Sequence, residues 1–167
     1  MPLATAYIAL GSNLGDRLGQ MQTALDRLTQ QSVVVQQISP VYENRAVGMG
    51  VADPFLNATA AIKTSLAPLA LLDLCLDVEG QLGRRRSRQW APRTIDLDII
   101  AYAELELSTD RLRLPHPRIE ERDFVLHPLR DIAPDLTIRG RRVADLAAEL
   151  PMDALTRCGF SLHAPRV

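Results

Sequence analysis

Two aspartates separated by one residue are the part of this sequence whose types and spacing point most directly to chemistry. They lie in the apolar segment Ile95-Asp96-Leu97-Asp98-Ile99-Ile100, whose pattern predicts a β-strand. Residues two apart in a strand share a face, so both carboxylates point the same way, about 6.6 Å apart at the backbone. Magnesium prefers oxygen ligands and is commonly held by carboxylates together with substrate phosphates, so the pair predicts a magnesium–phosphate site. A solvated outer face of the sheet is the competing interpretation, because one-sided sheets alternate in the same way.

A loop rich in arginine precedes this strand. The segment from Gly83 to Arg93 contains five arginines, and Arg93 lies three residues before Asp96. Guanidinium groups beside a metal-bound polyphosphate suit phosphoryl transfer, where catalysis is mainly positioning and charge neutralisation. A solvated loop or a nucleic-acid patch is the alternative. The neighbouring aspartates argue against the patch, because their charge would repel a nucleic-acid backbone.

Other candidate residues are weaker when taken singly. Glu79 falls among apolar residues of an expected helix, so it lies either at the margin of that face or in a site. Arg111 and Arg113 alternate and would share a face. His116 lies between prolines, which is typical of a loop residue. Phe124 is of a type that most often lies in the core.

Composition excludes several classes of protein. The chain has 167 residues and a net charge of −1, and of its 19 basic residues only Lys63 is lysine, so 18 are arginine. We expect one domain over residues 1–167. No apolar run suggests a membrane span or signal peptide. The three histidines do not have zinc-site spacing, and aromatic residues at 4% are too few for a base-stacking surface. We expect a cytoplasmic protein with reduced Cys75 and Cys158.

The elements that must position these residues follow from periodicity. Strands are expected over 3–10, 33–42, 55–64 and 95–102, and helices over 16–30 and 67–82, with Ser65 as a cap of the second helix. Residues 11–13 are expected to form a turn and 44–54 a loop. The order β-α-β-β-α-β predicts an α+β, ferredoxin-like sheet with two helices on one face. A C-terminal extension would add helices near 123–132 and 143–150.

Together these segments resemble the 6-hydroxymethyl-7,8-dihydropterin pyrophosphokinase family, from Ala6 to about Pro134. The resemblance is carried by Tyr7-Ile8-Ala9-Leu10-Gly11-Ser12-Asn13-Leu14-Gly15, Phe55-Leu56-Asn57 and Pro92-Arg93-Thr94-Ile95-Asp96-Leu97-Asp98-Ile99. Arg111-x-x-x-Pro115-His116 and Arg122-Asp123-Phe124-Val125-Leu126-x-Pro128-Leu129 follow in the family's order. The resemblance implies a ferredoxin-like fold and transfer of pyrophosphate from ATP to the pterin hydroxymethyl group. AMP would be released, as a step of folate biosynthesis.

The resemblance also implies roles for individual residues. Two magnesium ions would be bound by Asp96 and Asp98, which with Arg84 and Arg93 would form the catalytic set. ATP would contact Glu79, Arg84, Arg86, Trp90, Arg93, Ile99, Arg111, Arg113, His116 and Arg122. The pterin would contact Asn44, Val47, Phe55, Asn57, Asp96 and Phe124. The partners expected are these two small molecules, without nucleic acid or membrane, and the chain is expected to be a monomer.

Two departures from the family's pattern leave alternatives open. The segment Asn44–Val47 lacks a Thr-x-Pro-like stretch, and Leu76 stands where the family often has glutamine. A related enzyme acting on another pterin or another small alcohol is therefore the second hypothesis. A ferredoxin-like nucleic-acid-binding or regulatory module is the third. It predicts binding that weakens steeply with salt and needs no magnesium.

Overall fold

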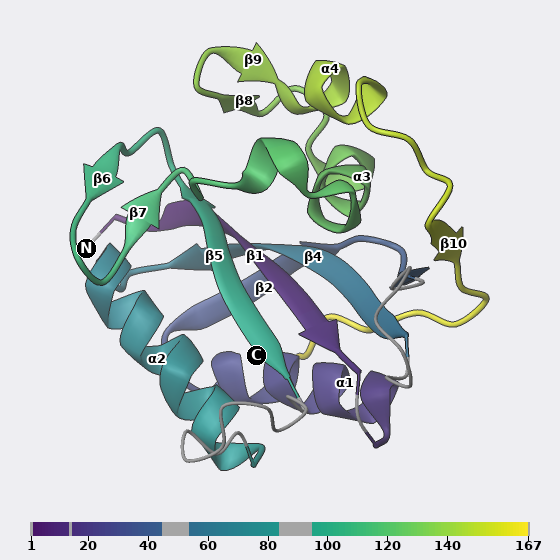
Figure 1. Ribbon diagram of the computed structural model, residues 1–167. Helices are drawn as coiled ribbons and strands as arrows, with labels where there is room; N and C mark the ends of the chain where they lie inside the picture. The colour runs from purple at the N-terminus through teal and green to yellow at the C-terminus, as the bar shows by residue number, and fades with distance from the viewer. Residues whose placement is uncertain (1, 14, 45–53, 84–94, 167) are drawn as a thin grey trace.

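An antiparallel sheet forms the centre of the molecule (Figure 1). The computed structural model describes residues 2–13, 15–44, 54–83 and 95–166. The strands of this sheet are β1 (Ala4–Ser12), β2 (Val33–Ile38), β3 (Tyr42–Asn44), β4 (Phe55–Thr64), β5 (Asp96–Tyr102) and β10 (Leu155–Arg157). The helices are α1 (Arg17–Leu28), α2 (Pro68–Gln81), α3 (Asp123–Ile132) and α4 (Val143–Ala148), with a 3₁₀ turn η1 (Ile119–Glu121). Two small hairpins pair β6 (Leu107–Ser108) with β7 (Arg113–Leu114) and β8 (Thr137–Ile138) with β9 (Arg141–Arg142).

The strand order confirms the predicted ferredoxin-like α+β arrangement. The sheet runs β10-β3-β4-β1-β5, and β2 also pairs with β4. Each helical crossover therefore skips one strand position: β4 lies between β1 and β2, and β1 lies between β4 and β5. This is the split βαβ topology. Helices α1 and α2 lie on one face of the sheet, and α3 and α4 lie on the other (Figure 1).

Alternation along the strands divides the core between the two faces. The apolar residues beneath α1 and α2 include Ile8 and Leu10 of β1, Leu56 of β4, and Leu97 and Ile99 of β5. The opposite face packs Ala9 and Ile100 against α3, α4 and η1. On this second face the described helices do not cover the ends of β1, β4 and β5 that carry Gly11, Asn57 and Asp96. Polar residues gather around these strand ends.

Two predicted element boundaries are wrong at β1 and β2. Gly11 and Ser12 belong to β1 and not to a turn, because Gly11 pairs with Asn57 on one side and Asp96 on the other. Pairing on both sides overrides the turn preference of glycine. The expected strand 33–42 is two strands, because Pro40 has no N–H for the ladder. At this break the Thr59 amide donates to Ser39 Oγ, 2.9 Å away.

The predicted cap of α2 is also wrong. Ala67 is the N-cap residue and makes no side-chain cap bond, and Pro68 begins the helix. Proline is favourable there because its missing N–H would have had no helical partner. The hydroxyl of Thr64 accepts the Leu66 amide instead of Ser65 capping the helix. Asn44, expected in a loop, is the last residue of β3.

The C-terminal segment is joined to the rest of the fold at two places. Helices α3 and α4 and the β8–β9 hairpin share one apolar cluster, which includes Ile119, Ile138 and Val143. Strand β10 pairs with β3, so Leu155 lies opposite Asn44. Within the described ranges, no helix is long and apolar enough to cross a bilayer.

Candidate active site

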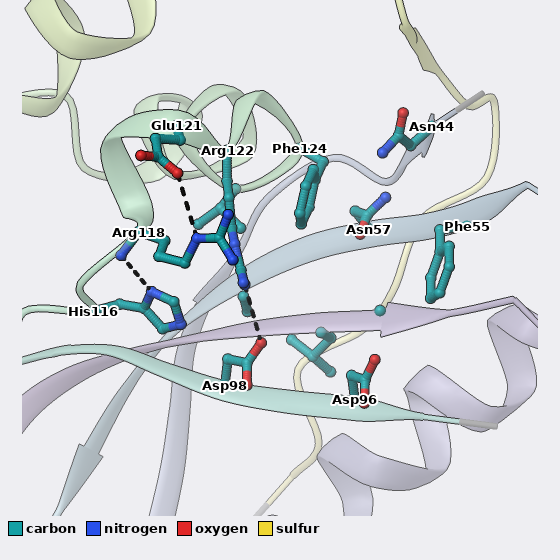
Figure 2. A pocket seen from close by; sticks show the side chains of 14 residues that line it. Asn44, Phe55, Asn57, Asp96, Asp98, His116, Arg118, Glu121, Arg122 and Phe124 are labelled. Atoms are coloured by element: carbon teal, nitrogen blue, oxygen red, sulfur yellow. Dashed lines mark hydrogen bonds and ion pairs between the residues drawn. The ribbon is translucent and has the colours of Figure 1, made fainter. Parts of the chain in front are cut away.

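The two aspartates share the polar face of β5, as their spacing predicted. Asp96 lies opposite Gly11 of β1 and Asp98 lies opposite Ala9. Both aspartates are partly exposed, whereas Ile95, Leu97 and Ile99 between and beside them are buried. In Figure 2 both carboxylates project from β5 toward the side occupied by His116 and Arg122. The polar face of β5 therefore lines a pocket and is not simply a solvated outer face of the sheet.

Glu79 is buried beneath this strand. Its side chain is 3% exposed, and its Oε2 accepts the Leu97 amide at 2.8 Å. Strand β5 ends the sheet order, so this amide lies on a strand with one sheet neighbour among the described residues. A carboxylate at that edge satisfies the backbone donor between the two aspartates and is itself kept hydrogen-bonded, which buried carboxylates require. Glu79 is therefore not at an exposed margin of its helix, and its described contact is with the strand that carries the aspartates.

Arg122 brings a positive charge to the aspartates. Its Nη1 lies 3.7 Å from Asp98 Oδ2, and its guanidinium lies 5.8 Å from the ring centre of Phe124. Arg122 is the residue before α3, so its position is set by the packing of that helix on the sheet. One guanidinium therefore connects the Asp98 carboxylate to an aromatic ring.

His116 is held through both its backbone and its ring. Its amide donates to the Ile100 carbonyl at 2.9 Å, and its Nδ1 accepts the Arg118 amide at 3.1 Å. Burial lowers the pKa of His116, and the positive charge of Arg122 lowers it further. The neutral ring with Nδ1 as acceptor carries its proton on Nε2, so it presents an N–H donor.

A pocket of about 600 Å³ opens above the aspartates. Its wall includes Phe55 and Asn57 from β4, Asn44 from β3 and Phe124 from α3 (Figure 2). Asn57 is 5% exposed, and its Nδ2 has no hydrogen-bond partner among the described residues. A buried amide donor without a partner is costly unless a bound molecule accepts from it. The pocket therefore suits a flat ring with polar groups along its edge, and we call it the ring pocket.

Gly11 forms part of the floor of this pocket. A Cβ at Gly11 would lie 3.3 Å from Asn57 Oδ1 and 3.7 Å from Phe55 Cδ1. A side chain there would press on Asn57 and would be in ordinary contact with Phe55. Glycine keeps that space open.

A second pocket, of about 310 Å³, lies between α2, β5 and the segment that leads to His116. It is lined by Leu72, Leu97, Asp98, Ile99, Thr109, Asp110, Arg111, Leu112, Arg113, His116 and Pro117. Asp98 and His116 line both pockets. A molecule in the second pocket would thus meet a molecule in the first at Asp98 and His116.

The comparisons with known proteins agree on a family. Residues 7–134 match the model of the family described as 7,8-dihydro-6-hydroxymethylpterin-pyrophosphokinase (HPPK). The chain belongs to this family. A 2-amino-4-hydroxy-6-hydroxymethyldihydropteridine pyrophosphokinase of Methylorubrum extorquens is 42% identical over 93% of this chain and 99% of its own length. The enzyme of the same name from Pseudomonas aeruginosa is 43% identical over 90% of this chain and 94% of its own length. Membership in this family makes the chain an ATP-dependent pyrophosphokinase.

A solved structure shares the HPPK fold. The wild-type HPPK-DHPS of Plasmodium falciparum, crystallised with SDX-DHP, aligns with a TM-score of 0.70 at 13% sequence identity. The alignment covers 92% of this chain and 47% of that chain. At this identity the likeness supports the fold alone, and it agrees with the split βαβ sheet described above.

The HPPK residues predicted from the sequence fall into three groups, apart from Glu79, which lines neither pocket and binds the Leu97 amide beneath β5. The ring pocket brings together Asn44, Phe55, Asn57, Asp96, Asp98, His116, Arg122 and Phe124. The second pocket brings together Ile99, Arg111 and Arg113 with Asp98 and His116. Five predicted residues, Val47, Arg84, Arg86, Trp90 and Arg93, lie outside the described residues.

Several wall residues of the ring pocket were not predicted. They are Ala9, Leu10, Gly11, Arg118, Glu121 and Val125. For Ala9 and Gly11 a signal was present, because they share one face of a strand that pairs with the aspartate strand. It was missed because Gly11 was assigned to a turn. Arg118 and Glu121 lie in a segment without periodicity, so the sequence offered no signal for them.

Proposed function

We propose that this chain transfers the pyrophosphoryl group of ATP to the hydroxyl group of 6-hydroxymethyl-7,8-dihydropterin, forming AMP and the pterin diphosphate in folate biosynthesis. The observation that carries the proposal is the meeting of two pockets at Asp98 and His116. The second pocket would hold ATP and the ring pocket the pterin. The acceptor hydroxyl and the phosphates would then meet beside the aspartate pair.

Magnesium suits the residues at this junction. Asp96 and Asp98 offer oxygen ligands on one face of a strand, partly open to the pocket. Among the described residues, no third carboxylate, histidine or thiol completes a metal-binding group with them. Two carboxylates favour a hard cation that takes its remaining ligands from phosphate and water. Two bound magnesium ions would neutralise the phosphates and align the β-phosphoryl group for attack.

Cationic and hydrogen-bonding side chains would bind the rest of the polyphosphate. Arg111, Arg113 and Arg122 provide guanidinium groups, and His116 provides its Nε2–H. Guanidinium groups match phosphate geometry through paired N–H donors. Glu79, which holds the Leu97 amide, would support the strand beneath the ATP site. The family resemblance adds four further ATP contacts to the proposal: Arg84, Arg86, Trp90 and Arg93.

The ring pocket would bind the pterin by stacking and by its polar edge. Phe55 of β4 and Phe124 of α3 both line the pocket, and Figure 2 shows them on either side of Asn57. The free Nδ2 donor of Asn57 would meet an acceptor on the pterin edge. Asn44 lies on the same wall, and Val47 is proposed there by the family resemblance.

The reaction needs no covalent enzyme intermediate. The pterin hydroxyl oxygen would attack the β-phosphorus of ATP, forming a new P–O bond. The bond from that phosphorus to the α,β-bridging oxygen would break, and AMP would leave with the electron pair. The hydroxyl proton would pass to water. The side chains would act by positioning and charge stabilisation, as is general for phosphoryl transfer.

A chromatographic assay tests this function. The protein would be incubated with ATP, magnesium and 6-hydroxymethyl-7,8-dihydropterin, and AMP and the pterin diphosphate would be measured. We expect equal amounts of both products, and none when magnesium or the pterin is omitted. AMP formed at a higher rate with another pterin or another alcohol would assign a different substrate. Absence of both products from folded protein would refute the proposal.

Assembly and partners are also part of the proposal. We propose that the chain folds as one domain, because β10 and α3 join the C-terminal segment to the sheet that carries the site. We also propose that it is a monomer and that it acts on these small molecules without nucleic acid. Light scattering after gel filtration would give the mass of one chain. A dimer mass would contradict the monomer.

A further inference from the structure

Arg139 makes three contacts with the segment that carries His116. Its Nη2 donates to the Pro115 carbonyl at 3.0 Å and to the His116 carbonyl at 2.9 Å. Its Nη1 forms an ion pair with the Glu120 carboxylate. One planar guanidinium therefore joins both ends of the loop between His116 and η1, an arrangement that its fixed fork of donors permits.

The hairpin that carries Arg139 is firmly attached. Ile138, the residue before it, is 1% exposed and belongs to the same apolar cluster as Ile119 of η1. Two further hydrogen bonds close the base of the hairpin by joining the segment after α3 to the start of α4: the Val143 amide donates to the Leu136 carbonyl and the Ala144 amide to the Pro134 carbonyl. Arg139 therefore contacts the His116 segment from a hairpin whose own position is fixed by packing and hydrogen bonds.

The backbone of Arg139 indicates that its side chain matters. Arg139 has a φ of 48°, a left-handed conformation that residues other than glycine adopt at a steric cost. Glycine would accept this conformation freely and would serve the turn at least as well. An arginine here accepts that cost and supplies the three contacts.

The geometry points to Arg139 as a positioning residue for ATP binding, which acts by holding His116 at the junction of the two pockets. The inference rests on the proposed function. Arg139 lies beyond residues 7–134, the part of the chain that matches the family model. The His116 carbonyl accepts from Arg139, its amide donates to the Ile100 carbonyl, and its Nδ1 accepts the Arg118 amide. These contacts leave the Nε2–H of His116 available to donate to a phosphate oxygen.

The test compares Arg139→Gly with a matched control. Arg139→Gly removes the three contacts but leaves a residue suited to the turn, so its melting temperature should not fall. Arg141→Ala is the control, because Arg141 lies in the same hairpin and pairs with Glu149. Arg139→Lys keeps a positive charge without the planar fork, so it should restore part of what glycine loses.

The main measurement is calorimetric binding of α,β-methylene-ATP with magnesium and without pterin. This analogue cannot release AMP, so binding is measured apart from turnover. Arg139→Gly should weaken its binding about tenfold, because a misplaced positioning group has effects of this order or more. Arg141→Ala should bind it as the unaltered protein does. The KM for ATP should rise with the dissociation constant, while the KM for the pterin stays unchanged.

A second readout follows the ring of His116 directly. Nitrogen NMR of the unaltered protein should show a bare Nδ1 and a protonated Nε2, and Arg139→Gly should give a mixture of tautomers. Unchanged analogue binding in Arg139→Gly, or an equal loss for both substrates, would overturn the inference. Absence of AMP from the unaltered protein with the pterin would refute the proposed function instead, while analogue binding and NMR would still test Arg139.

Discussion

The guanidinium of Arg122 lies 3.7 Å from the carboxylate of Asp98, at the boundary between the two pockets. The Asp98 side chain is 48% exposed, so this ion pair contributes at most about 1 kcal/mol to stability. Its importance is in placement. Arg122 also lies over the ring of Phe124, so one side chain connects the proposed phosphate and pterin sites.

Replacement of Asp98 should separate activity from stability. We expect Asp98→Asn to lower kcat by at least about a hundredfold, because the proposed magnesium ligand is lost while the shape is kept. Its melting temperature should stay close to that of the unaltered protein, since the mutation removes repulsion from Asp96 along with a weak ion pair. Asp96→Asn should lose activity in the same way. Asp153→Asn, on the exposed segment before β10, is the control. A large loss of stability in Asp98→Asn would mean that Asp98 is structural.

Phe124→Ala should weaken pterin binding more than ATP binding. Removal of a stacking aromatic ring costs about 1 to 3 kcal/mol for a nucleobase-like ring. Calorimetry with the pterin and, separately, with α,β-methylene-ATP would measure both affinities. Phe160→Ala is a suitable control because Phe160 is 44% exposed and does not line the ring pocket. A larger loss for the nucleotide would show that the two sites are assigned in reverse.

Gly11→Ala should raise the KM for the pterin. The added methyl group would lie 3.3 Å from Asn57 Oδ1, which is tighter than ordinary contact, so Asn57 or the bound ring must shift. We expect roughly a tenfold effect on the pterin and little on ATP. Gly80→Ala is the matched control, because a Cβ there meets nothing within 4 Å and lies in α2. That control should stabilise the protein by about 0.5 to 1 kcal/mol. Unchanged pterin kinetics in Gly11→Ala would place the ring elsewhere.

The stability of the protein should depend on pH through His116. Burial, followed by the charge of Arg122, lowers the pKa of His116 in the folded protein. The unfolded chain therefore takes up a proton near pH 6.5, the ordinary value, before the folded protein does. His116 should accordingly reduce stability as pH falls from about 6.5 toward its folded pKa, and contribute no such loss above that range.

Thermal unfolding across this pH range would measure the effect. His116→Gln should make the melting temperature less dependent on pH below about 6.5, because the titrating group is gone. NMR titration of the His116 ring should give a midpoint below that of an unfolded peptide. A midpoint above it would mean that Asp98, whose charge raises this pKa, has more influence than burial and Arg122.

Local patterns in the sequence determined the order of elements and the direction of the aspartates. The alternation around Asp96 and Asp98 has the two-residue period of a strand, and the apolar spacing of α1 has the period of a helix. Both periods are properties of short stretches of chain. The β-α-β-β-α-β order then allows only a few sheet topologies, because helical crossovers are right-handed and chain connections are almost never knotted. The sheet order and the common face of α1 and α2 followed from these constraints.

Tertiary structure alone decided the contacts that convert these elements into a site. Glu79 lies 18 positions before Leu97, and Arg139 lies 23 positions after His116, so neither contact leaves a periodic trace in the sequence. Gly11 was assigned to a turn because the preference of glycine is local, whereas its pairing with Asn57 and Asp96 is not. The chemical type of a residue can be read at its own position in the sequence. The residue that it contacts depends on how distant segments pack together. The sequence by itself therefore determined which groups are available, and the fold determined which of them meet.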